Sequence, residues 1–252
     1  MDTTPCDSNF CFPIPPSFES DRVKLTPLVP SEHAKPIFEQ MQLYPQIFNL
    51  LPMEPFKDFD AFSVNFLANN IHKDTGSILF VIYDKTKASA LSDAHPDIAA
   101  DQGALAGIIG LTHSSPADLN TEIGCVVIFP PFQRTHVTTH SAGLLLQYAL
   151  NLPSEQPGAL GLRRVSWRAN WLNKASVRTA ERLGFKFETV LRWNRVFPVG
   201  KVHVGAGNGR KTRPGDPRAD HPGVDSVVLG LCWDDWEDEA KEKVAAAMSR
   251  TV

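Results

Sequence analysis

The chain has 252 residues, of which 42% are hydrophobic and 21% are charged, and its formal net charge is -3 at pH 7. These values are typical of a globular protein with one sizeable domain, and they exclude a disordered chain. The slightly negative charge gives no global reason to expect a nucleic acid as a partner.

The first 20 residues are rich in proline and predict an extended arm, and we expect residues 21–252 to form a single domain. The arm lacks the basic start and continuous apolar segment of a secretory signal, so we expect a cytoplasmic protein. No apolar run approaches the roughly 20 residues of a membrane-spanning helix, so no membrane partner is expected. The four cysteines have no C-x-x-C spacing, which predicts free thiols and no metal site.

Apolar periodicity predicts strands and helices along the first half of the chain. An alternating segment and several compact apolar runs have the length of strands. Ser31 occupies the position of a helix N-cap, and a second helix follows Asp58. The predicted strands are 22–28, 77–84, 104–113 and 121–129, with a polar surface loop at 85–103.

Helices and strands alternate in the second half of the chain. A helix with one apolar face begins at Val137, and another opens at Asn173 and ends at Gly184, in the position of a left-handed C-cap. A polar helix closes the chain. The predicted strands are 163–170, 185–197 and 224–233, and a long basic loop at 198–222 joins the last two.

The most specific pattern of the chain runs from Asn173 to Phe185. It contains Asn173, Ser176 and the triplet Leu183-Gly184-Phe185 in the spacing N-x-x-S-x-x-x-x-x-x-L-G-F. This pattern resembles the branch of the GNAT superfamily of N-acetyltransferases that includes the bacterial ribosomal-protein alanine acetyltransferases.

The resemblance implies a fold and a cosubstrate. The order of predicted elements over residues 22–233 is similar to that of the GNAT fold. That fold is α/β (α+β), with a mixed central sheet of about seven strands, a splayed strand pair, about four flanking helices and a C-terminal helix. Acetyl-CoA would insert between the splayed strands, and no metal would take part.

The implied function is acetyl-CoA-dependent transfer of an acetyl group directly to a primary amine, such as a protein N-terminus, an amino acid or a small amine. The alternative is a noncatalytic CoA-binding or interaction module that keeps the GNAT fold. A third and weaker reading is a nucleic-acid-binding protein acting through the basic loop. We expect a monomer or a homodimer.

The phosphate-binding turn departs from the family pattern. The family loop reads Q-x-x-G-x-G/A, and the corresponding segment here has no glycine. The pyrophosphate of CoA needs unpaired backbone N–H groups at a helix N-terminus, and these donors belong to the backbone. Either the turn has a conformation that other residues tolerate, or the pyrophosphate site is weakened. The implied cofactor-binding residues are Gln133, Arg134, Thr135, His136, Val137 and Thr138.

The resemblance also implies catalytic roles. Glu122 takes the place of the base, acting directly or through water, and Ser176 that of the hydroxyl that protonates the leaving sulfur. Asn173 would contact the pantetheine arm. The alternatives are an exposed ion pair for Glu122 and a local helix cap formed by Asn173 and Ser176. The backbone N–H groups expected to polarise the thioester oxygen are those of Val126, Val127 and Ile128.

Two histidines are alternative bases. His113 and His136 both fall near strand or loop ends beside the expected site. The mechanism needs no covalent acyl-enzyme, so we expect Cys125 to be a packed small side chain.

At the acceptor end, the resemblance implies that Trp193 and Arg195 bind the substrate. Packing within the sheet is the alternative for the aromatic side chain. The loop at 198–222 is either a lid over the acceptor site or a solvated loop, and its cations also suit an acidic peptide, RNA or the 3′-phosphate of CoA.

Overall fold

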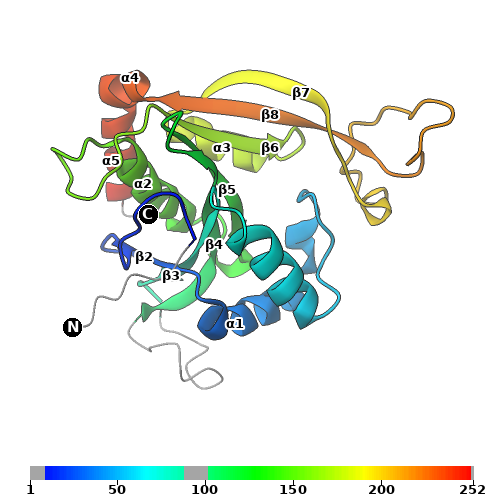
Figure 1. Ribbon diagram of the computed structural model, residues 1–252, viewed down its shortest axis with the longest axis horizontal. Helices are drawn as coiled ribbons and strands as arrows, with labels where there is room; N and C mark the ends of the chain where they lie inside the picture. Colours follow the sequence, from blue (N-terminus) through cyan, green and yellow to red (C-terminus); the bar gives the residue numbers. More distant parts are fainter. Residues whose placement is uncertain (1–8, 88–101, 251–252) are drawn as a thin grey trace.

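The computed structural model describes residues 9–87 and 102–250, and its centre is one mixed sheet of eight strands (Figure 1). The strands are β1 (Phe18–Glu19), β2 (Val23–Pro27), β3 (Ile78–Asp84), β4 (Ala104–Ser115), β5 (Asn120–Ile128), β6 (Arg164–Asn170), β7 (Lys186–Val196) and β8 (Gly223–Cys232). Their order across the sheet is β1-β2-β3-β4-β5-β6-β8-β7. Neighbouring strands are antiparallel except β5 and β6, which are parallel.

Helices pack against both halves of this sheet. They are α1 (Pro30–Leu43), the 3-10 helix η1 (Pro45–Phe48), the π-helix η2 (Ala61–His72), η4 (Pro130–Phe132), α2 (Val137–Leu150), α3 (Lys174–Arg182), η5 (Val199–Lys201), α4 (Trp233–Asp235), η6 (Trp236–Ala240) and α5 (Lys241–Ser249). Helix α2 packs on α5 and on strands β1 to β6, whereas α3 packs on β6 and β8. Helices α1 and η2 pack on each other, with η2 against β3 (Figure 1).

The core lies around the middle strands. Strand β3 is buried along its whole length, as is β4 up to Thr112. Continuous apolar runs of this kind are typical of strands with both faces covered. Strand β7 forms an edge of the sheet and is exposed along almost all of its length, with Phe187 at 58% and Trp193 at 43% exposure.

The predicted fold class is confirmed, with eight strands where about seven were expected. The additional strand, β1, lies in the predicted arm, where Phe18 pairs with Leu25 of β2. Phe18 is buried against Phe80 and Tyr148, which explains why so short a strand stays in place. Residues 1–8 of the arm and 88–101 of the predicted loop 85–103 lie outside the described residues.

Two predicted helix ends have different outcomes. The N-cap expected at Ser31 is wrong, because α1 begins at Pro30 and Val29 is its N-cap residue. Proline suits the first turn because its missing N–H would have no helical partner there. The left-handed conformation expected for Gly184 is confirmed by its φ of 96°.

Among residues 9–87 and 102–250, no helix has the length and apolar character required to cross a bilayer. Cys11, Cys125 and Cys232 are free thiols. Within the described chain, Cys232, Asp234 and Asp235 form the one group of three possible metal ligands. Asp235 is already bonded to Lys186 and to the backbone N–H of Cys232, so the local structure accounts for this group.

Candidate active site

The site is built around an irregularity in β5. Two residues of this strand, Cys125 and Val126, stand opposite the single residue Ile109 of β4, and Cys125 has a φ of 50°. The approach of the strands is close, since a Cβ on Gly107 would lie 2.1 Å from the carbonyl oxygen of Val127. Such a bulge bends the strand that carries the extra residue. Glycine on β4 therefore permits the bend in β5.

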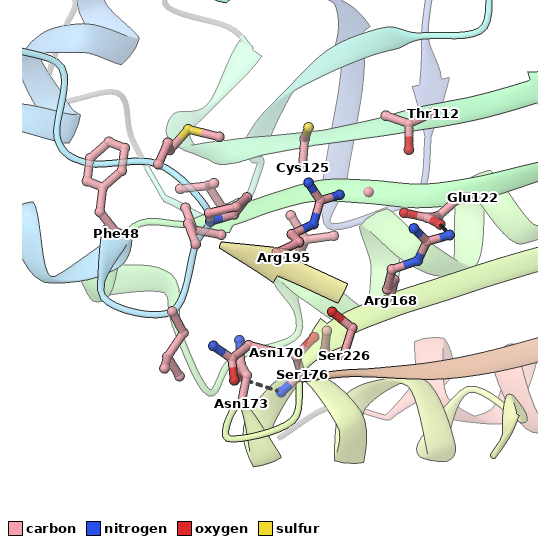
Figure 2. Close-up of a pocket in the computed structure, with 18 of the residues that line it drawn as sticks. Phe48, Thr112, Glu122, Cys125, Arg168, Asn170, Asn173, Ser176, Arg195 and Ser226 are labelled. Carbon is pink, nitrogen blue, oxygen red and sulfur yellow. Dashed lines mark hydrogen bonds and ion pairs between the residues drawn. The ribbon is translucent and has the colours of Figure 1, made fainter. Parts of the chain in front are cut away.

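Strand β5 separates from β6 halfway along its length. Their parallel pairing runs from Asn120 and Arg164 to Ile123 and Trp167, and there it ends. Beyond this point β5 continues to pair with β4 as far as Ile128, while β6 continues with β8. The predicted splayed pair is thus present. A cavity of about 230 Å³ opens beside the separation (Figure 2).

Glu122 lies where the separation begins, with only 8% of its surface exposed. Its Oε2 is 3.1 Å from Nη2 of Arg168, and its Oε1 is 3.8 Å from Nδ1 of His113. All three side chains line the cavity. In the strand register Glu122 stands beside Ser166, so Arg168 lies two positions further along the same face of β6. A guanidinium therefore orients the carboxylate in the cavity wall.

The start of α3 forms a second polar part of the wall. Asn173 is the N-cap residue, and its Oδ1 accepts the backbone N–H of Ser176 at 3.1 Å. Ser176 Oγ in turn accepts the indole N–H of Trp167 at 2.9 Å. An indole N–H can only donate, so this bond leaves the serine O–H free to donate elsewhere. Both Asn173 and Ser176 line the cavity (Figure 2).

Cys125 also lines the cavity but is poorly suited to be a nucleophile. The pKa of its thiol is raised to about 11, mainly by burial and also by Glu122, while Arg195 partly opposes the shift. The reactive form of a cysteine is the thiolate, which such a pKa makes scarce at neutral pH. The thiol thus fits the packing role expected for it.

The turn at 133–138 follows β5 and leads into α2. The side-chain N–H of Gln133 donates to the carbonyl oxygen of Ile128 at 2.9 Å, and the hydroxyl of Thr135 donates to that of Phe132 at 2.6 Å. Arg134 is the residue with left-handed backbone, at φ 60°. The first backbone N–H groups of α2 have no partner within the helix. The N–H of Gln133 already donates to the carbonyl oxygen of Pro130 and that of Val137 to the hydroxyl of Thr135, so an anion would have to use other N–H groups of the turn.

His136 stands at the first glycine position of the family pattern and adopts ordinary helical angles, φ -64° and ψ -21°. Its Nε2 lies 3.2 Å from Oδ1 of Asp84, a fully buried residue at the end of β3. The backbone here does not require glycine, because right-handed helical angles are sterically allowed for L-residues. At His136 the backbone thus has a conformation that residues other than glycine tolerate.

The structure brings some of the predicted site residues together and places others apart. Glu122, Ser176, Asn173 and Arg195 line the cavity, as do Val126 and Val127. The remaining expected residues are not in its lining: Ile128, the turn residues Gln133, Arg134, Thr135, His136, Val137 and Thr138, and Trp193. The turn lies beyond the end of β5, and the ring of Trp193 packs over Gly223.

Sequence reasoning missed the side of the cavity that faces β5. We call it the apolar wall; it comprises Met41, Phe48, Leu50, Leu51, Pro52, Met53, Phe56 and Phe66. Phe56 contacts both Phe48 and Phe66, with ring centroids 5.7 and 5.4 Å apart. The run of aromatic and methionine residues between 38 and 66 was the available signal, but it is equally typical of ordinary core packing.

Loop 198–222 supports the apolar wall without lining the cavity. Lys201, only 4% exposed, donates from Nζ to the carbonyl oxygen of Phe48 at 2.5 Å. Burial lowers the pKa of Lys201, and nearby Glu54 partly opposes that shift. Leu50 of the wall also packs on a small cluster formed by Phe197, Ala206 and Val224.

Solved structures with the same fold include several acetyltransferases. A probable GNAT-family acetyltransferase from Chromobacterium violaceum is 26% identical, with a TM-score of 0.65 and 88% of each chain covered. RimJ from Mycobacterium smegmatis, in complex with CoA-disulfide, is 14% identical, with a TM-score of 0.60 and 89% of this chain and 88% of that chain covered. Spermidine N-acetyltransferase from Vibrio cholerae, in complex with CoA and spermine, is 16% identical, with a TM-score of 0.59 and 87% and 100% covered.

No curated protein sequence matches the chain. A family model does: that of the acetyltransferase (GNAT) domain matches residues 22–186, which is more than half of the chain. The bulged and splayed β5 and the capped helix α3 that follows β6 lie within the matched residues. The chain belongs to the GNAT family of N-acetyltransferases.

Proposed function

We propose that the protein transfers an acetyl group from acetyl-CoA directly to a primary amine. The observation that carries this proposal is the end of β5–β6 pairing at Ile123, where a cavity of about 230 Å³ is lined by both Glu122 and Ser176. Two solved structures of the same fold hold CoA or CoA-disulfide, which supports acetyl-CoA as the cosubstrate. The amine acceptor and the cytoplasmic location remain predictions.

The residues present suit acetyl-CoA at three places. Backbone N–H groups from Gln133 to Thr138 would bind the pyrophosphate at the start of α2, where the helix dipole also favours an anion. On the side where β6 has separated, β5 is not paired with β6 at Val126 and Val127. This edge of β5 would bind the pantetheine arm, and Asn173 would lie beside it. The same strand's N–H groups, including that of Ile128, would polarise the thioester oxygen.

Acetyl-CoA would supply a thioester: as the amine nitrogen bonds to the acetyl carbon, the carbon–sulfur bond breaks and CoA leaves as a thiolate. Glu122 accepts the proton that the nitrogen loses, directly or through water. Ser176 gives its free O–H proton to the sulfur and regains one from solvent. Arg168 orients the carboxylate and remains protonated throughout.

The ribosomal-protein alanine acetyltransferase branch stays a proposal as well. RimJ is among the structural neighbours, but its 14% identity supports a common fold and no common acceptor. The acceptor classes compatible with the chemistry are a protein N-terminus, a free amino acid and a small amine. The noncatalytic CoA-binding module is the outcome against which the enzyme is tested.

Two measurements on the whole chain test the proposal. Acetyl-CoA at about 100 times its Kd should stabilise the fold by about 2.7 kcal/mol in thermal unfolding. A panel of primary amines should then release free CoA thiol from acetyl-CoA in the presence of the protein. Stabilisation without thiol release from any amine would support the noncatalytic module, and no stabilisation would contradict the CoA site.

A further inference from the structure

The cavity holds a positive charge that no carboxylate of the described residues neutralises. Within the described chain, Glu122 is the only carboxylate in the cavity lining, and it is paired with Arg168. Arg195 lines the same cavity, and none of the described carboxylates forms an ion pair with it. Figure 2 shows its guanidinium reaching from β7 toward Cys125 of β5. The cavity therefore presents an available cation with five N–H donors.

An irregular stretch of β7 brings Arg195 to this place. Residues 193 and 195 of a regular strand would share one face. Here the register of β7 with β8 shifts between Leu191 and Arg195, and Trp193 has a φ of 55°. The buried carboxylate of Asp225 accepts the backbone N–H of Trp193 at 2.8 Å and holds this conformation. As a result Trp193 packs over Gly223 while Arg195 enters the cavity.

A large part of the cavity lining is hydrophobic. The apolar wall contributes eight side chains, three of them aromatic and two of them methionine. Its rings contact one another and its backbone is tied to Lys201, so the surface is assembled before any ligand arrives. Such a surface suits an aliphatic or aromatic group of a small molecule.

We infer that the acceptor is a small hydrophobic α-amino acid whose carboxylate is bound by Arg195 and whose side chain packs on the apolar wall. This inference rests on the proposed function and narrows it. A guanidinium binds a carboxylate through two parallel N–H···O bonds, which fixes both position and orientation. The α-amine, one carbon away from that carboxylate, is then directed at the thioester side of the cavity. Arg195 is a specificity-determining residue in this arrangement.

Two other acceptor classes fit the cavity less well. A polyamine would bring a second ammonium group close to Arg195, and like charges in a partly enclosed site repel. The N-terminus of a protein has an amide where the free amino acid has its carboxylate, so Arg195 would lose its anionic partner. Both classes serve as arms of the test.

The experiment measures kcat/KM by thiol release for three acceptors with the same phenyl side chain, L-phenylalanine, phenethylamine and L-phenylalaninamide. Spermidine is the fourth acceptor and represents the polyamines. L-Phenylalanine should exceed each of the other three by about tenfold or more, as a charge-assisted bidentate contact would give. L-Leucine, isopentylamine and L-leucinamide repeat the comparison with an aliphatic side chain. Calorimetric titration of L-phenylalanine into the CoA-saturated protein provides a reading that does not depend on turnover.

Three variants test whether Arg195 causes the preference for L-phenylalanine. Arg195→Gln should bring the ratio of L-phenylalanine to phenethylamine down to about one, while Arg195→Lys should keep part of it because the charge remains. Arg192→Gln removes an equal charge from the same strand, outside the cavity lining, and should leave the ratio unchanged. Thermal stabilisation by acetyl-CoA should be the same in all three variants.

The outcomes separate this inference from the proposed function. Turnover of phenethylamine or L-phenylalaninamide as efficient as that of L-phenylalanine would overturn the amino-acid specificity and leave the acetyltransferase standing. The same holds if spermidine is the best acceptor, or if Arg195→Gln keeps the wild-type ratio. Binding of acetyl-CoA without acetylation of any acceptor would overturn the proposed function, and the inference with it.

Discussion

On one side of the cavity the proposed contacts come mainly from backbone groups, and on the other they come from side chains. We call the first the cofactor side: β5 and the start of α3 in the cavity lining, together with the turn at 133–138, which lies beyond the end of β5. The second is the acceptor side: the apolar wall and Arg195. Backbone donors keep their positions when side chains change, provided the fold is kept. At His136, where the family has a glycine, the backbone keeps ordinary helical angles, so the proposed donors do not depend on glycine at that position.

The acceptor side has no such tolerance, because its surface consists of the side chains themselves. Its residues come from α1, η1, the segment before η2, η2 itself and β7. The wall comes from the single stretch 41–66, whereas Arg195 comes from β7, which is distant in sequence and meets the wall only in the fold. In the proposed reaction, cosubstrate binding therefore depends mainly on backbone geometry, whereas acceptor choice depends on side chains. The following changes test each side.

Replacing the proposed base should have the largest effect. Glu122→Gln keeps the shape of the side chain but removes the proton acceptor, so kcat should fall about 100-fold while the acetyl-CoA affinity stays nearly constant. Steady-state kinetics at pH 7 with acetyl-CoA titration measures both. Glu188→Gln is the matched control. Glu188 pairs at 2.6 Å with Arg164, which is on β6 like the partner of Glu122, and Glu188 does not line the cavity. Wild-type turnover in Glu122→Gln would remove Glu122 from the mechanism.

Removing the proposed acid should have a smaller effect on turnover. Ser176→Ala takes away the proton for the leaving sulfur, and kcat should fall about tenfold because water can partly replace it. The indole N–H of Trp167 also loses its acceptor, which should lower the free energy of unfolding by about 1–3 kcal/mol. Ser176→Thr retains a hydroxyl and should restore most of kcat. If Ser176→Ala loses stability but keeps its kcat, the residue has only a structural role.

Loosening the apolar wall should affect only the acceptor. Lys201→Met removes the N–H donor that fixes the backbone at Phe48, so the acceptor KM should rise about threefold to tenfold with the acetyl-CoA KM unchanged. Lys211→Met, an exposed position in the same loop, is the control. Equal KM values for the acceptor in both variants would show that the loop does not hold the wall.

Restoring the family glycine at position 136 should have the smallest functional effect of these four changes, because CoA binding should not become tighter. His136→Gly should not tighten CoA binding, because the backbone angles at this position already suit any residue. It should lower the free energy of unfolding by about 1–3 kcal/mol, since Asp84 is fully buried and loses a partner. Calorimetry with CoA and urea unfolding measure the two quantities. A clearly tighter CoA complex would mean that the histidine obstructs the pyrophosphate site.

Much of the fold was predictable because the signals for it are local. Apolar runs predicted every strand from β2 to β8, and the C-cap at Gly184 is confirmed. Strand β1 was missed because two residues carry no periodicity, and only the packing of Phe18 reveals it. The N-cap expected at Ser31 was wrong because Pro30 can itself begin a helix.

The sequence by itself determined the family and the capped helix at Asn173, because that pattern lies within one stretch of chain whose spacing survives in the helix. Only the tertiary structure decided the ion pair of Glu122 with Arg168, the turning of His136 toward Asp84 and the entry of Arg195 into the cavity. The first and the third depend on strand register or on a bulge, and the second depends on how the turn at 133–138 lies against the end of β3. A shift of one residue along a strand reverses the face on which a side chain lies, and no local pattern in this chain reports that shift.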